Sequence, residues 1–147
     1  MTRIEIERLS AEHRNFIRQQ DHTRGQLKKP KLPAPTAYGY EFDSKLELAF
    51  SQILEAWRAR GTIAEWRYHA MRFRLSSNCT YEPDFCTVEP DSLRIALYEV
   101  KGSWKMKNAR DSRTRLSIAA SMYPFFAWYG VTRPDGEWYY ETINAGG

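Results

Sequence analysis

Two short strand-like runs, residues 81–88 and 98–102, are separated by a cluster of turn-forming residues at 89–92. Successive side chains of a strand point to opposite faces, so Glu99 and Lys101 share one face. If the two runs pair as a hairpin, Asp84 near the start of the first run lies beside Glu99 near the end of the second. The pattern therefore predicts two carboxylates and one ammonium group in a small space.

A cluster of this kind has an electrostatic cost. Neighbouring carboxylates repel each other, and burying them costs free energy unless a cation compensates their charge. Carboxylate oxygens are the hard ligands that Mg²⁺ and Mn²⁺ prefer. We therefore predict that the chain is built around a Mg²⁺ site in which Mn²⁺ can substitute.

Length and composition limit the class of protein. With 147 residues, of which 42% are hydrophobic and 14% aromatic, the chain can form one compact domain with a core. No apolar run approaches the length that spans a bilayer, and the N-terminus lacks the apolar stretch of a secretory signal. Cys79 and Cys86 do not make a disulfide framework, and Cys86 is interpreted as a small buried side chain. These features predict a cytoplasmic protein without a membrane partner.

The net charge is +4, and the basic residues are concentrated in two tracts. Residues 24–31 contain four Lys or Arg and no acid, and residues 101–115 contain six against Asp111 alone. A charge run is most often a solvated surface. The second tract, however, begins at the carboxylate cluster, which favours a polyanionic partner that carries phosphate groups.

The first 36 residues are predicted to be an extension. Ser10 is suited to cap a short helix that continues to Gln20, although its apolar stripe is thin. The following residues, 21–36, are polar and basic and contain three prolines, which is typical of an extended linker. We therefore divide the chain into an N-terminal extension, 1–36, and a main domain, 37–147.

The clearest helix begins near Leu46 and ends before Gly61, because its apolar residues recur with helical spacing. Ser44 and Glu47 match a capping box, in which the Glu47 side chain pairs with the backbone of Ser44. Glu47 also lies at the edge of the buried stripe, where an inward carboxylate could reach a second metal or a metal-bound water. The two roles are compatible, and both stay open.

The rest of the chain alternates between strand and helix patterns. The predicted elements are strands at 63–69 and 71–75, a loop at 76–79, the two hairpin arms, a helix at 108–122, a buried strand at 125–131 and an edge strand at 137–143. In the second hairpin arm, Leu93, Ile95 and Leu97 alternate. This order predicts an α/β fold in which helices flank one mixed sheet.

The motifs together resemble a known superfamily. Glu47 on the first helix, the pair Pro83–Asp84 and the run Glu99–Lys101 match the pattern of the PD-(D/E)xK nucleases, and the resemblance covers residues 38–131. The chain is most similar to Holliday-junction resolvases of the phage endonuclease I type and to small phage nucleases with the same element order. The shared sequences are Ser-x-x-Glu, Tyr-x-Pro-Asp-Phe and Glu-x-Lys-Gly-x-Trp, present here at 44–47, 81–85 and 99–104.

The resemblance implies a restriction-endonuclease-like fold and a Mg²⁺-dependent endodeoxyribonuclease. Asp84 and Glu99 would bind the metal together with the Val100 carbonyl, and Glu47 would hold a second metal or its water. Lys101 would orient or deprotonate the attacking water. Because neighbouring carboxylates favour the ammonium form, Lys101 is better cast as an electrostatic stabiliser that positions the water. As a plain surface ion pair, Glu99 and Lys101 would contribute only about 0–1 kcal/mol.

Both basic tracts are predicted to contact DNA, and phosphate contacts hold a backbone without reading its sequence. The predicted contacts are Lys28, Lys29, Lys31, Trp104, Lys105, Lys107, Arg110 and Arg113. Trp104 would stack on a base or flank the scissile strand, and a core position is equally compatible with its sequence context.

We expect a homodimer that cuts branched DNA in phage recombination, repair or DNA processing, within the host cytoplasm if a phage encodes the chain. Two alternatives stay open. One is a catalytically inert DNA-binding module on the same scaffold, and the other is a sequence-specific nuclease of the restriction type.

Overall fold

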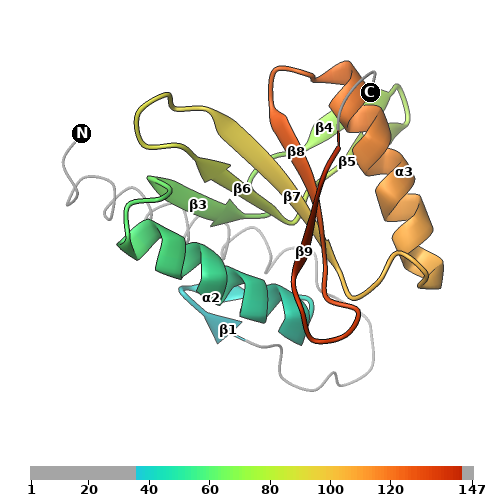
Figure 1. The fold of residues 1–147 in the computed structure, drawn as a ribbon. Coiled ribbons are helices and arrows are strands. Elements are labelled where there is room, and N and C mark those ends of the chain that lie inside the picture. Colours follow the sequence, from blue (N-terminus) through green and yellow to red (C-terminus); the bar gives the residue numbers. More distant parts are fainter. Residues whose placement is uncertain (1–35, 144–147) are drawn as a thin grey trace. The chain divides into compact units, whose positions relative to one another are not determined.

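The computed structural model describes residues 36–143, and Figure 1 shows the order of their elements. The chain divides into two compact units, one that ends at Ala49 and one that begins at Phe50. This boundary falls inside helix α2 (Lys45–Ala59). The predicted N-terminal helix and the predicted DNA contacts Lys28, Lys29 and Lys31 lie outside the described residues.

The first unit contains a short hairpin and the start of α2. Strands β1 (Thr36–Ala37) and β2 (Tyr40–Glu41) pair antiparallel. The two residues between them, Tyr38 and Gly39, both have positive φ, which a two-residue turn of type I′ requires. The backbone N–H of Glu47 then donates to Oγ of Ser44 over 3.1 Å, which confirms Ser44 as the predicted N-cap of α2.

The second unit is organised around a mixed sheet with the strand order β3-β6-β7-β8-β9 (Figure 1). These strands are β3 (Glu65–Tyr68), β6 (Phe85–Val88), β7 (Ile95–Lys101), β8 (Ala127–Thr132) and β9 (Tyr139–Thr142). Neighbouring strands are antiparallel except β7 and β8, which are parallel and are connected through helix α3 (Lys107–Met122). The predicted mixed α/β fold, the β6–β7 hairpin and the edge strand β9 are confirmed.

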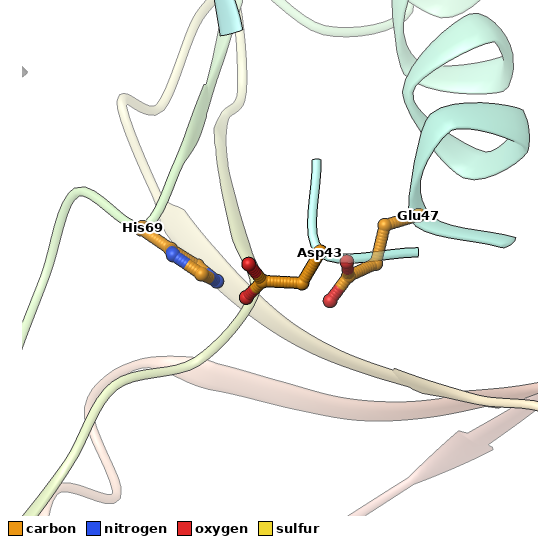
Figure 2. A group of neighbouring side chains, drawn as sticks. All are labelled: Asp43, Glu47 and His69. Atoms are coloured by element: carbon orange, nitrogen blue, oxygen red, sulfur yellow. The ribbon is translucent and has the colours of Figure 1, made fainter. Parts of the chain in front are cut away.

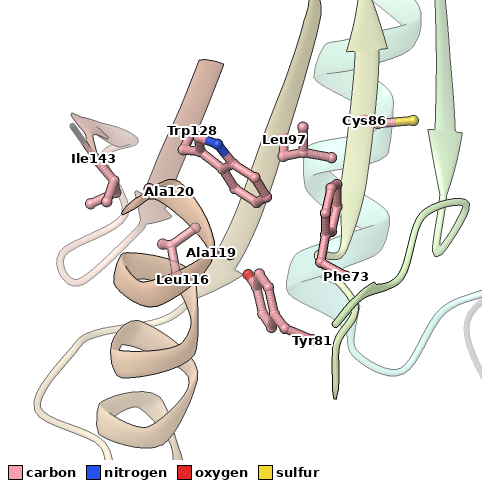
Figure 3. Packing of buried hydrophobic residues seen from close by; sticks show 9 residues of the cluster. All are labelled: Phe73, Tyr81, Cys86, Leu97, Leu116, Ala119, Ala120, Trp128 and Ile143. Atoms are coloured by element: carbon pink, nitrogen blue, oxygen red, sulfur yellow. The ribbon is translucent and has the colours of Figure 1, made fainter. Parts of the chain in front are cut away.

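Helices cover both faces of this sheet. On one face, the Phe50 ring of α2 lies 5.6 Å from the Tyr98 ring, measured between centroids. On the other face, Leu116 of α3 belongs to a buried cluster with Leu97 and Trp128, which Figure 3 shows between helix and sheet. Leu97 and Tyr98 are consecutive in β7 and therefore point to opposite faces.

A two-stranded ribbon formed by β4 (Phe73–Ser76) and β5 (Cys79–Tyr81) covers part of the α3 face. The Phe73 ring packs 5.0 Å from the Trp128 ring. The predicted loop over residues 76–79 is therefore too long. Ser76 is the last residue of β4 and Cys79 is the first residue of β5, so only the two residues between them form the turn. The run 81–88 is also interrupted, so that Asp84 precedes β6 instead of lying within it.

Two apolar residues predicted to lie in strands are exposed instead. Leu93 lies in the turn before β7 with a φ of 57°, a left-handed conformation that a strand cannot contain. Phe125 lies in the turn after α3, and strand β8 begins two residues later at Ala127. Cys86, in contrast, is buried as predicted.

Candidate active site

The β6–β7 hairpin brings Asp84 and Glu99 together. Phe85 pairs with Tyr98 in the strand register, which places Asp84 opposite Glu99. The backbone N–H of Val100 donates to Oδ2 of Asp84 over 2.7 Å. Asp84 is 6% and Glu99 is 4% exposed, so both carboxylates are taken out of water.

Each oxygen of the Glu99 carboxylate has its own neighbour. Oε2 accepts a hydrogen bond of 2.6 Å from the hydroxyl of Tyr81, at the end of β5. Oε1 lies 3.5 Å from Nζ of Lys101, two residues further along β7. The Lys101 side chain is 28% exposed, so its ammonium group lies where the buried carboxylates meet solvent.

The electrostatics of this group are dominated by burial. Burial, followed by the negative charge of Asp84, raises the pKa of Glu99 to about 8, against the opposing effects of Tyr81 and Lys101. One lysine and one hydroxyl therefore do not compensate the two buried carboxyl groups. A divalent cation between them would remove most of this cost, because opposite charges favour the ionised form.

His69 also lies at the site, beside Asp84. Its Nε2 is 3.6 Å from Oδ1 of Asp84, and its Nδ1 is 3.5 Å from Oε1 of Glu82. Its backbone has a φ of 49°, in the left-handed region where residues other than glycine cluster at functional positions. A lone histidine at the end of a strand is most often a structural, hydrogen-bonded residue. The backbone conformation and the contact with Asp84 were not visible in the sequence pattern.

In the first unit, Figure 2 shows the side chains of Asp43 and Glu47, which offer oxygens within 4.8 Å of each other. Figure 2 also labels His69, which belongs to the second unit. Two carboxylates this close together within the first unit are of the type that could hold a metal ion. Glu47 was a candidate from the sequence, whereas Asp43 was missed. Asp43 directly precedes the N-cap of α2, where an acid has an ordinary role beside the helix dipole.

The predicted DNA contacts fall into two groups. Lys105, Lys107 and Arg110 are exposed around the start of α3. Arg113 is engaged within the protein, because its guanidinium donates over 2.5 Å to each carboxylate oxygen of Glu141.

Trp104 is half-buried and packs against the sheet. The Arg113 guanidinium lies over its ring, 5.2 Å from the centroid. The ring also occupies the space above Gly130, where an added Cβ would lie 2.6 Å from Trp104 Cζ2. Of the two readings of Trp104, the structure therefore favours packing on the sheet over a ring that is free to stack on a base.

Comparison of the chain with protein-family models, with curated proteins and with solved structures gave no match. Among the described residues, neither α2 nor α3 combines the length and the apolar character needed to cross a membrane. Function must therefore be inferred from the chemistry of the site itself.

Proposed function

We propose that this chain is a metal-dependent endonuclease that hydrolyses phosphodiester bonds in DNA and has a restriction-endonuclease-like fold. The observation that supports this function most strongly is the buried pair of Asp84 and Glu99, with Lys101 at its solvent side. The mixed sheet with a helix on each face is compatible with such a fold.

The oxygen donors at the end of the hairpin fit a hard divalent cation. Asp84 and Glu99 provide two carboxylates, and Val100 provides a carbonyl. The N–H and C=O of one strand residue point to the same side, so the Val100 carbonyl faces the side on which its N–H meets Asp84. We propose that these three groups hold Mg²⁺ or Mn²⁺. Such a cation supplies a water that ionises near neutral pH and positive charge for the phosphoryl oxygens.

The other residues have roles that follow from their positions. Lys101 is partly exposed beside Glu99, where its ammonium group can orient the attacking water and stabilise negative charge on the phosphate. The N–H of Val100 and the ring of His69 lie against different oxygens of Asp84 and hold that carboxylate in place. Glu47, which helical spacing places on the same stripe as Phe50 and Leu54, is proposed to hold a second metal or its water.

The exposed residues Lys105, Lys107 and Arg110 are proposed to contact DNA phosphates. This tract follows Lys101 directly in the chain, so a strand bound along it passes close to the proposed metal site. A preference for branched DNA and a homodimeric assembly are further proposals, and they rest on the resemblance to phage endonuclease I.

The experiment is cleavage of a four-way junction, a flap, a linear duplex and a single strand, with Mg²⁺ or Mn²⁺, by wild type and Asp84→Asn. Asp91→Asn is the matched control, because it neutralises an exposed acid in the turn of the same hairpin. We expect wild type and Asp91→Asn to cut branched DNA and Asp84→Asn to be inactive.

Other results distinguish the alternatives. Cutting of linear duplex at one sequence would favour a restriction-type nuclease. Salt-sensitive DNA binding without cutting under either metal would favour an inert binding module. Neither binding nor cutting of any DNA would show that the proposal is wrong.

A further inference from the structure

Tyr81 reaches the acidic pair from outside the main sheet. It is the last residue of β5, whose partner is β4 in the ribbon, and it is 5% exposed. Its hydroxyl donates to Oε2 of Glu99 over 2.6 Å, across 18 residues of sequence. The ribbon thus places the buried Tyr81 hydroxyl against Oε2 of Glu99, which is a proposed metal ligand.

The hydroxyl acts as a donor in this contact. The acceptor is Oε2 of Glu99, and burial raises the pKa of Tyr81, in keeping with a protonated phenol. A phenol has one proton to donate, and here that proton is directed at Glu99. Because its proton is engaged by Oε2 of Glu99, Tyr81 contributes to the site through that carboxylate.

A glutamate carboxylate needs such support. The terminal torsion of a Glu side chain is broad, so burial alone does not fix the plane of the carboxylate. In this structure Oε2 meets the Tyr81 hydroxyl, and Oε1 faces Nζ of Lys101. Of these two contacts, the one to Tyr81 is shorter and comes from a side chain held in the core.

We propose that Tyr81 is a positioning residue of the metal site, whose hydroxyl holds the Glu99 carboxylate in the orientation that binds the cation. This inference rests on the proposed function, since it assigns Tyr81 a part in that same site. Loss of a hydrogen bond to a metal ligand typically weakens metal affinity by about 10–100-fold, which sets the size of the expected effect.

The chain offers a matched control in Tyr98. Tyr98 is 7% exposed, and its hydroxyl accepts a hydrogen bond of 3.3 Å from Thr87 on the opposite face of the sheet. Tyr81→Phe and Tyr98→Phe each remove one buried phenolic hydroxyl and keep the aromatic ring. The first change removes the donor to Glu99, and the second leaves the acidic pair untouched.

The test is calorimetric titration of Mn²⁺ into the full-length wild type and both variants, together with their melting temperatures without metal. We expect Tyr81→Phe to bind Mn²⁺ about 10–100-fold more weakly and Tyr98→Phe to stay within about twofold of wild type. We also expect excess Mn²⁺ to restore most DNA cleavage by Tyr81→Phe, because every ligand is still present. Cleavage by Glu99→Gln should not recover.

Three results would overturn the inference. If wild type binds and cuts while Tyr81→Phe binds Mn²⁺ as wild type does, Tyr81 has no positioning role and the proposed function stands. Equal loss of affinity in both variants would point to general loosening of the fold. If wild type neither binds Mn²⁺ nor cuts DNA, the proposed function fails, and the role of Tyr81 fails with it.

Discussion

Two glutamates lie in one row across the sheet and have opposite electrostatic properties. Glu99 of β7 pairs with Gly130 of β8, and Gly130 pairs with Glu141 of β9, so the three residues face the same side. The pKa of Glu99 is raised to about 8, chiefly because the side chain is buried. The pKa of Glu141 is lowered, chiefly because it accepts hydrogen bonds from Arg113.

The difference lies in how each charge is compensated. Glu141 is exposed and receives both arms of a guanidinium, the strongest common pairing for a carboxylate. Glu99 is buried beside a second acid and has one lysine 3.5 Å away. Glu141 thus contributes to the structure of the surface, whereas burial of Glu99 costs free energy of folding. A carboxylate of the second kind is a candidate for a functional site, because perturbed pKa values cluster at such sites.

The sharpest test of this comparison replaces each glutamate by glutamine. We expect Glu99→Gln to lower the rate of DNA cleavage by at least about 100-fold, the scale for losing one preorganised electrostatic contact. The same change should raise the melting temperature without metal at pH 8 and above, since it removes a buried charge. Glu141→Gln should leave cleavage within about threefold of wild type and slightly lower the melting temperature. Equal losses of activity in the two variants would contradict the distinction.

The second prediction concerns the pH dependence of stability without metal. The folded-state pKa of Glu99 lies above its ordinary value, so its protonation stabilises the fold, and this stabilisation is lost as pH rises toward about 8. Each unit of such a shift corresponds to about 1.4 kcal/mol. Urea unfolding of the wild type should be measured from about pH 5 to about pH 8.5, which spans the interval between the ordinary and the raised pKa of Glu99. We expect its free energy of unfolding to decrease as the pH rises.

Two variants and added Mg²⁺ distinguish the contribution of Glu99 to this pH dependence from the contributions of other titrating groups. Glu99→Gln should flatten the decline, whereas Glu141→Gln should retain it. The contribution of Glu141 has the opposite sign, because it is present above the ordinary pKa and is lost as pH falls through the lowered value. Added Mg²⁺ should reduce the decline in wild type by favouring ionised Glu99. A decline that persists in Glu99→Gln would assign the effect to another group.

The sequence was sufficient to predict the parts of this fold that depend on local patterns. Helix α2 follows from apolar spacing and the Ser44 cap, and α3 follows from its apolar stripe, which Pro124 ends. The neighbourhood of Asp84 and Glu99 follows from side-chain alternation combined with one hairpin. In each case the signal lies within about 20 residues, and the physical rule that interprets it has a fixed period.

The missed features depend on contacts between distant segments. Tyr81 donates to Glu99 because the β4–β5 ribbon folds onto the sheet, and Arg113 meets Glu141 across 28 residues. No periodicity in the sequence encodes these pairings. The packing of Trp104 also depends on a distant residue. Its ring occupies the space above Gly130, which is open because glycine has no side chain. A glycine in a strand indicates a close approach, but it does not identify the approaching group.

The third prediction tests the packing of Trp104 on Gly130, the residue that lies between Glu99 and Glu141 in the sheet. Gly130→Ala would place a Cβ 2.6 Å from the rigid Trp104 ring, so ring or strand must move. We expect the free energy of unfolding to fall by about 1–3 kcal/mol, the usual cost of overpacking. The control is Gly102→Ala, whose Cβ would meet only the flexible end of Met106 at 3.5 Å.

A double mutant with Trp104→Leu identifies the cause. If the ring is responsible, Gly130→Ala should cost less in the Trp104→Leu background than in wild type, since contacting residues are not additive. Equal costs in both backgrounds, measured by urea unfolding, would show that the ring does not limit the space above Gly130.

The smallest effect is expected at the exposed end of the row. Arg113→Gln should cost about 0.2–1 kcal/mol of stability, the range for exposed ion pairs, and less at high salt. If Arg113 stays paired with Glu141 in the complex with DNA, the change should leave DNA affinity within about twofold. Lys107→Gln, at an exposed position, should instead weaken binding and reduce the slope of log affinity against log salt by about 1. An equal reduction of that slope by Arg113→Gln would mean that Arg113 leaves Glu141 to bind phosphate. Glu141 would then hold its charge partner only in the absence of DNA, and the contrast with Glu99 would apply to the free protein alone.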